Sequence, residues 1–141
     1  MRTASLLAAA GLIALTGCGG SDSSPPAPLT NAFTGTLSIT GPLPTGTTTC
    51  QATHTVTFTS AGVDVHTVSA AGGDCLTFTN TDTASHRPAS IGTPACAELG
   101  ASLPLAQGQS FTTTPLGGPK TCHWQDLLNP PSTGGGGGGG Y

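Results

Sequence analysis

The chain has 141 residues, of which 6% are charged and 35% are apolar, and its formal net charge at pH 7 is −3. Three lysine and arginine residues cannot neutralise a phosphate backbone, so the composition excludes nucleic acid as a partner. β-Branched residues recur in alternation through the middle of the sequence, which excludes a charge-rich disordered protein. Without a leader and two low-complexity stretches, roughly 100 residues remain, about the size of one domain.

The first residues have the pattern of a signal peptide. Arg2 gives a positive end, and residues 6–15 form an apolar run that is too short to span a bilayer as a mature helix. The ending Leu15-Thr16-Gly17-Cys18 resembles the bacterial lipobox, in which the cysteine becomes the new N-terminus and receives acyl chains. We therefore predict a lipoprotein signal peptide over residues 1–17 and lipidation of Cys18. The alternative is a plain secretory signal with an incidental cysteine.

Low-complexity stretches flank the predicted domain. Residues 18–32 are rich in Gly, Ser and Pro, and we predict that they form the lipidated cysteine and a flexible tether to the membrane. Gly19 follows the cysteine, which by analogy with known lipoproteins favours the outer membrane, on its periplasmic face or at the cell surface. Residues 132–141 contain a run of seven glycines and are predicted to be a disordered tail.

The middle of the chain carries the signals of short strands. Alternation with a period of two predicts strands at residues 33–40, 53–59, 63–68, 75–79, 109–113 and 120–124. The second and third segments are predicted to pair as a hairpin through Ser60-Ala61-Gly62. Residues 93–107 lack a clear period and are predicted to be irregular, with a helical turn near residues 96–99. About seven short strands without helix-length periodicity predict an all-β sandwich over residues 33–131.

Four cysteines remain once Cys18 is set aside, an even number in an oxidising compartment. We predict two disulfides, although four cysteines allow three connectivities. If the hairpin is centred near residues 61–63, Cys50 falls almost opposite Cys75, so Cys50–Cys75 is the preferred bridge and Cys96–Cys122 follows. Each bridge closes a loop of about 26 residues, worth roughly 3.5 kcal/mol in the chain-entropy model.

Between Cys75 and Pro130 a set of short motifs follows in a fixed order. They are Phe78-Thr79-Asn80-Thr81-Asp82, His86, Cys96-Ala97-Glu98-Leu99, Leu105-Ala106-Gln107-Gly108-Gln109-Ser110-Phe111, Thr121-Cys122 and Leu128-Asn129-Pro130. Their order and spacing resemble the cupredoxin family, the blue-copper-like β-sandwiches, over about half of the mature chain. The resemblance implies a cupredoxin-like Greek-key sandwich. It also implies that His86, just after the Asn-x-Asp turn, is a copper ligand, with the other ligands on the closing loop.

The closing loop departs from the family pattern. Gln125 and Leu127 stand where such relatives carry histidine ligands on either side of an aspartate. Cys122 and His123 are adjacent, and neighbouring side chains on a strand point to opposite faces, so they do not converge on one ion. A blue-copper centre needs two imidazoles and a thiolate. We therefore predict a degenerate copper site, with His86 and His123 as the candidate metal ligands. No cofactor is expected, and copper is the alternative.

Two further histidines lie on the predicted hairpin. His54 shares the strand parity of Val56 and Phe58, which predicts a partly buried side chain with a backbone partner. His66 lies with Asp64 on the other side of its strand and is expected to face away from His54. No pair of histidines has a convincing metal spacing.

The sequence contains no Gly-x-Ser-x-Gly elbow, no HExxH motif and no phosphate-binding glycine loop, so we predict that the protein is not an enzyme. The leading hypothesis is a lipid-anchored, extracytoplasmic, cupredoxin-like module for binding or structure. Its partners would be the membrane, through Cys18, and an unidentified envelope protein. One alternative is a copper-binding or electron-transfer lipoprotein that uses His86, His123 and a carboxylate such as Asp126. The other is a surface adhesion protein whose threonine-rich strands make the contact.

Overall fold

The computed structural model describes residues 32–131. This part of the chain forms eight strands and one 3₁₀ turn: β1 (Thr34–Thr40), β2 (Thr53–Thr59), β3 (Gly62–Val63), β4 (Thr67–Ala71), β5 (Cys75–Asn80), β6 (Pro88–Ile91), η1 (Ala97–Leu99), β7 (Ser110–Thr112) and β8 (Lys120–Asp126). The predicted signal peptide, the lipidation site at Cys18, most of the predicted tether and the glycine-rich tail lie outside the described residues.

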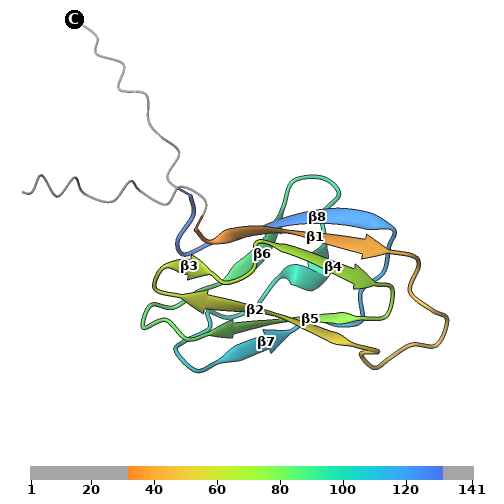
Figure 1. The fold of residues 1–141 in the computed structure, drawn as a ribbon, viewed down its shortest axis with the longest axis horizontal. Coiled ribbons are helices and arrows are strands. Elements are labelled where there is room, and N and C mark those ends of the chain that lie inside the picture. Colours follow the sequence, from red (N-terminus) through yellow and green to blue (C-terminus); the bar gives the residue numbers. More distant parts are fainter. Residues whose placement is uncertain (1–31, 132–141) are drawn as a thin grey trace, which may run out of the picture.

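The strands form two four-stranded sheets that face each other as layers (Figure 1). One sheet has the order β4-β1-β8-β6, with β1 parallel to β4 and antiparallel to β8. The other has the order β3-β2-β5-β7, with β2 parallel to β5. This arrangement confirms the predicted all-β, disulfide-stabilised sandwich.

The predicted hairpin is only partly formed. β2 and β3 pair through two residue pairs, Phe58 with Val63 and Thr59 with Gly62. The chain then crosses to the other sheet, where β4 runs parallel to β1. Val68 and Ala70 of β4 are buried in the core from that side. The burial of these side chains, a tertiary effect, therefore overrides the local pairing that the sequence favoured.

η1 confirms the helical turn that the sequence predicted near residues 96–99. The strand β6 was not predicted. β6 begins with Pro88, and a proline lowers the expectation of a strand because it has no backbone N–H. β6 lies at the edge of its sheet, and Pro88 is its first residue, which is the position where a strand tolerates proline.

The core lies between the sheets and is built by the inward residues of the alternating strands. Its largest buried side chains include Trp124, Phe58, Phe78, Leu37 and Leu76. The indole ring of Trp124 meets the rings of Phe58 and Phe78 edge-on, with centroids 6.1 and 5.0 Å away. Gly35 makes room for this indole, because a Cβ there would lie 2.5 Å from Trp124 Cζ2.

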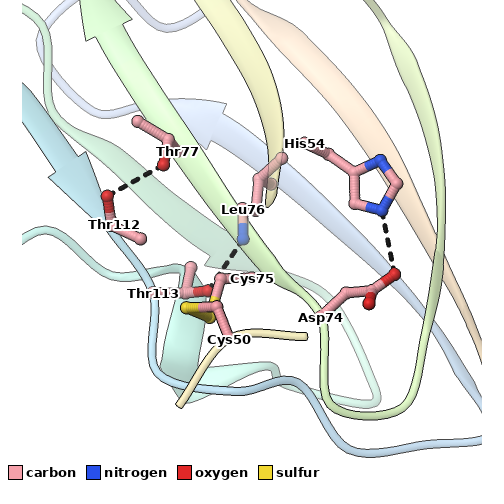
Figure 2. The surroundings of a disulfide bond; sticks show 8 residues. All are labelled: Cys50, His54, Asp74, Cys75, Leu76, Thr77, Thr112 and Thr113. Atoms are coloured by element: carbon pink, nitrogen blue, oxygen red, sulfur yellow. Dashed lines mark hydrogen bonds and ion pairs between the residues drawn. A yellow bond between two sulfur atoms is a disulfide. The ribbon is translucent and has the colours of Figure 1, made fainter. Parts of the chain in front are cut away.

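Both predicted disulfides are present, with Cα–Cα distances of 5.3 Å for Cys50–Cys75 and 6.0 Å for Cys96–Cys122. The preferred pairing is therefore confirmed, although the hairpin that suggested it is not what aligns Cys50 with Cys75. Thr53 is paired with Cys75 in the parallel β2–β5 ladder, and Cys50 lies just before β2. The first bridge thus fastens the approach to β2 onto the start of β5 (Figure 2).

Candidate functional site

His86 lies in the segment between β5 and β6 and is completely buried, with 0% of its surface exposed. Its backbone forms an isolated bridge with Leu105, in which each N–H donates to the other residue's carbonyl oxygen at 3.1 and 2.7 Å. The imidazole ring stacks parallel to the ring of Phe58 with centroids 4.5 Å apart, and the ring of Phe33 lies 4.9 Å away. The core therefore encloses this histidine.

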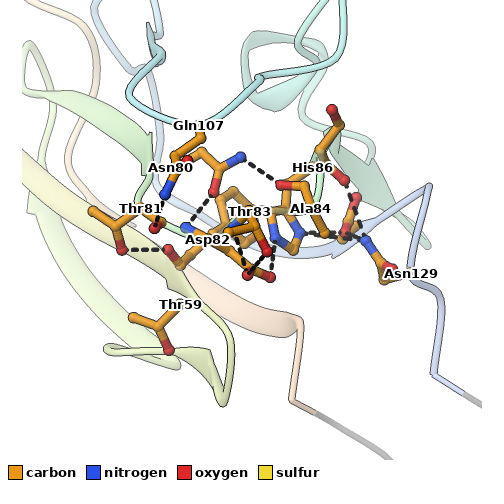
Figure 3. A network of polar contacts seen from close by, with 12 residues as sticks. Thr59, Asn80, Thr81, Asp82, Thr83, Ala84, His86, Gln107 and Asn129 are labelled. Atoms are coloured by element: carbon orange, nitrogen blue, oxygen red, sulfur yellow. Dashed lines mark hydrogen bonds and ion pairs between the residues drawn. The ribbon is translucent and has the colours of Figure 1, made fainter.

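Both ring nitrogens of His86 face carboxylates. Nδ1 lies 2.7 Å from Asp126 Oδ2, and Nε2 lies 3.1 Å from Asp82 Oδ2. An ionised carboxylate can only accept hydrogen bonds, so an imidazole ring that donates from both nitrogens satisfies both contacts. We call Asp82, His86 and Asp126 the histidine lock; Figure 3 shows the surrounding polar network, with Asp82, His86 and Asn129 labelled.

Asp126 is the centre of the hydrogen bonds around the lock. It is the last residue of β8 and shares the inward parity of Cys122 and Trp124. Its Oδ1 accepts from the backbone N–H of Arg87 at 2.7 Å and of Leu128 at 3.0 Å, and its Oδ2 accepts from Asn129 Nδ2 at 2.6 Å. Burial alone raises the pKa of Asp126, but these donors and His86 outweigh burial and hold the pKa below its ordinary value.

Asp82 is positioned by a turn that Asn80 organises. Asn80 is fully buried; its Oδ1 accepts from the Asp82 N–H at 2.8 Å, and its Nδ2 donates to the carbonyls of Ala84 and Leu105, both at 2.8 Å. This Asx turn is the geometry that an Asn-x-Asp sequence favours. Desolvation raises the pKa of Asp82, and the hydrogen bonds from His86 and from backbone N–H groups bring it below its usual value.

His123, the other candidate ligand, lies on the opposite face of β8. Its side chain is exposed, and Nδ1 lies 3.2 Å from Thr36 Oγ1, while the neighbouring Cys122 and Trp124 point into the core. The structure therefore does not bring His123 and His86 together. Cys122 is held in a disulfide. The residues around His86 do not fit the two imidazoles and free thiolate of a blue-copper centre.

In residues 32–131 no three or more His, Cys, Asp or Glu side chains are grouped so that they could hold a metal ion. A second histidine–carboxylate pair lies beside the Cys50–Cys75 bridge, where His54 Nε2 is 3.0 Å from Asp74 Oδ2 (Figure 2). The partner of His54 is thus a side chain, not the predicted backbone group. The bond to His54, followed by the bond from the Ala71 N–H, lowers the pKa of Asp74.

A shallow surface hollow of about 330 Å³ lies beside β7. It is lined by Ala101, Ser102, Leu103, Pro104, Leu105, Gln109, Ser110 and Phe111. None of these side chains titrates near neutral pH, so the hollow offers no acid, base or thiol nucleophile for catalysis.

Fold and site together define a class: a disulfide-stabilised, all-β sandwich with a buried histidine held between two carboxylates. A scan against protein-family models gives no match for the sequence, and a comparison with curated proteins gives none either. Within the described part of the chain, no helix has the length and apolar character needed to cross a membrane.

Proposed function

We propose that the protein is a lipid-anchored, non-enzymatic binding or structural module of the bacterial cell envelope, with a cupredoxin-like sandwich whose copper site is degenerate. The histidine lock is the observation that carries this proposal. His86 occupies the position that the cupredoxin resemblance assigns to a copper ligand, yet each of its ring nitrogens is within hydrogen-bond distance of a carboxylate. A metal ion would have to displace Asp82 or Asp126 to reach it.

The closing loop supports the same proposal. Gln125 is half-buried on β8, and Leu127 is exposed just after the strand, so neither position supplies an imidazole. The backbone N–H of Leu127 donates to the carbonyl oxygen of Arg87 at 2.9 Å, which fixes the loop where relatives of the cupredoxin type would place ligands. The loop closes the end of the sandwich with hydrogen bonds in place of metal bonds.

The anchor is tested by mass spectrometry of the full chain produced in a Gram-negative host. The mature protein is expected to begin at Cys18 and to carry acyl chains on that residue, because Leu15-Thr16-Gly17-Cys18 has the form of a lipobox. The Cys18→Ser variant should lack the acyl chains. A mature N-terminus at another residue, or an unmodified Cys18, would contradict the anchor.

Copper titration tests the degenerate site. The purified chain from Gly19 onward, with its disulfides oxidised, is expected to show no stoichiometric site for Cu(I) or Cu(II) that depends on His86. The His86→Ala variant and the wild type should therefore bind equally weakly, as expected for exposed histidines such as His66 and His123. Stoichiometric binding that disappears in His86→Ala would overturn the proposal and favour the copper-protein alternative.

A further inference from the structure

The chain enters the domain at the same end of the sandwich where β8 finishes. The carbonyl oxygen of Ala32 accepts from the Val63 N–H at 2.8 Å, and that of Phe33 accepts from the Asp126 N–H at 2.9 Å. In Figure 1 the start of β1, the end of β8 and β3 all lie at this end. We call it the anchor-side end, because the residues that lead back to Cys18 join the domain here.

Three apolar side chains project from the anchor-side end. Leu127 and Leu128 are 43% and 47% exposed, and Val65, in the connection from β3 to β4, is 37% exposed. His66, next to Val65, places this connection beside β1, since its Nδ1 lies 2.7 Å from the Thr34 carbonyl oxygen. We call Val65, Leu127 and Leu128 the apolar tip.

Two backbone hydrogen bonds fix the loop that carries the leucines of the tip, and one of them is to Asp126 of the histidine lock. The N–H of Leu127 donates to the Arg87 carbonyl at 2.9 Å, and the N–H of Leu128 donates to Asp126 Oδ1 at 3.0 Å. These bonds fix the backbone of the loop in the position that leaves both leucine side chains about half exposed. A fixed, outward pair of leucines costs little additional conformational entropy when a partner covers it.

We propose that the apolar tip rests on the surface of the lipid bilayer in which the acylated Cys18 is anchored; this inference depends on the proposed lipidation. Cys18 and Ala32 are 14 positions apart, so the chain between them spans at most roughly 50 Å even when fully extended. The apolar tip adjoins the point where this segment joins the domain. Of the two ends of the sandwich, the anchor-side end is therefore the one that reaches the membrane first.

The contact is apolar, not electrostatic. The chain has three Lys and Arg residues. Arg2 lies in the leader, and Lys120, at the start of β8 far from the tip, pairs with Glu98 at 2.9 Å. Arg87, whose carbonyl oxygen accepts from the Leu127 N–H, is the one of the three beside the tip, and the carboxylates of Asp82 and Asp126 at the same end outnumber it. Two half-exposed leucines bind lipid too weakly to act alone, but the anchor supplies a high effective concentration. The contact therefore needs neither anionic lipid nor low salt.

Quenching by brominated lipids tests the contact on full-length, acylated protein in phosphatidylcholine vesicles. Leu128→Trp places a fluorescent reporter in the tip. Leu43→Trp is its matched control, because Leu43 is 42% exposed and lies at the opposite end, where a Cβ on Gly117 would be 3.3 Å from it. The buried Trp124 of the wild type gives the background. The Leu128→Trp reporter is expected to be quenched roughly threefold more than the Leu43→Trp reporter. An interfacial contact inserts apolar side chains only about 5–10 Å into the boundary between headgroups and acyl chains, so the difference in quenching should be moderate.

The quenching at Leu128→Trp should persist in high salt and disappear when Leu127→Asp is added. Equal quenching of the two reporters, or quenching that high salt abolishes, would overturn the membrane contact while leaving the anchor intact. Acylation is measured by mass spectrometry on the same vesicles. A sample without acyl chains would overturn both the anchor and the contact that depends on it.

Discussion

The Asp126→Asn variant is expected to lose about 3–5 kcal/mol of unfolding free energy, because the substitution keeps the side-chain volume but removes a buried carboxylate on which four hydrogen-bond contacts converge. The amide can no longer accept at both oxygens, so at least one donor among the N–H groups of Arg87 and Leu128, Asn129 and His86 loses its acceptor. Urea unfolding followed by Trp124 fluorescence measures the loss.

The Asp64→Asn variant is the matched control. Asp64 is an exposed carboxylate that accepts one backbone bond, from the Thr57 N–H at 2.6 Å. Its substitution should cost about 1 kcal/mol or less. Losses of equal size for Asp126→Asn and Asp64→Asn would mean that the histidine lock contributes no special stability.

The pH dependence of stability follows from the same carboxylate. The pKa of Asp126 is lower in the folded protein than in the unfolded chain, so its contribution is fully present above the unfolded value, near pH 4. The contribution disappears as the pH falls through the lower, folded-state pKa. The pKa values of Asp74 and Asp82 shift in the same direction. The wild type should therefore lose stability below about pH 4, and Asp126→Asn should lose less over that interval.

Removing the disulfides is the second change with a large expected effect. The bridges span 25 and 26 positions, so the chain-entropy model gives each about 3.5 kcal/mol. The two bridges differ in burial: Cys96 and Cys122 are both completely buried, whereas in the other bridge Cys75 is buried and Cys50 is exposed. The Cys96→Ala/Cys122→Ala double variant should therefore lose more stability than the Cys50→Ala/Cys75→Ala double variant, because it truncates two buried side chains instead of one and leaves the larger cavity.

Together the two bridges supply a contribution comparable to the whole stability of a small domain, about 5–15 kcal/mol. The protein is expected to unfold when a reducing agent is added at constant pH and temperature. Circular dichroism and Trp124 fluorescence measure this directly. Folded, fully reduced protein with an unchanged urea midpoint would contradict the role assigned to the bridges.

Most strands could be predicted because their apolar and polar residues alternate without interruption, as in Thr53–Thr59, where Val56 and Phe58 are buried. The crossing from β3 to β4 could not, because nothing local separates a continued hairpin from a change of sheet. The disulfide pairing was predicted correctly from the wrong local geometry. Cys50 and Cys75 are aligned by the parallel β2–β5 ladder, a long-range pairing that periodicity does not reveal.

The candidate site was predictable in part. The Asn-x-Asp turn and the cupredoxin resemblance singled out His86, and the Gln125 and Leu127 substitutions indicated a site without the usual ligands. Of the two carboxylates that face His86, Asp126 was grouped with it only as a metal ligand in the copper-protein alternative, and Asp82 was not predicted as its partner. One signal was present, because Asp126 has the parity of Cys122 and Trp124 and a charged residue on that buried face needs a partner. The identity of the partner depended on packing between the sheets.

The histidine lock should keep His86 from binding metal, at the position where the cupredoxin resemblance implies a copper ligand. Nuclear magnetic resonance of the histidine side chains during Cu(I) addition to the oxidised protein tests it most directly. We expect the ring signals of His86 to stay unchanged at one equivalent of metal, while those of the exposed His66 and His123 respond weakly. A shift of the His86 ring nitrogens that saturates at one equivalent would contradict the claim.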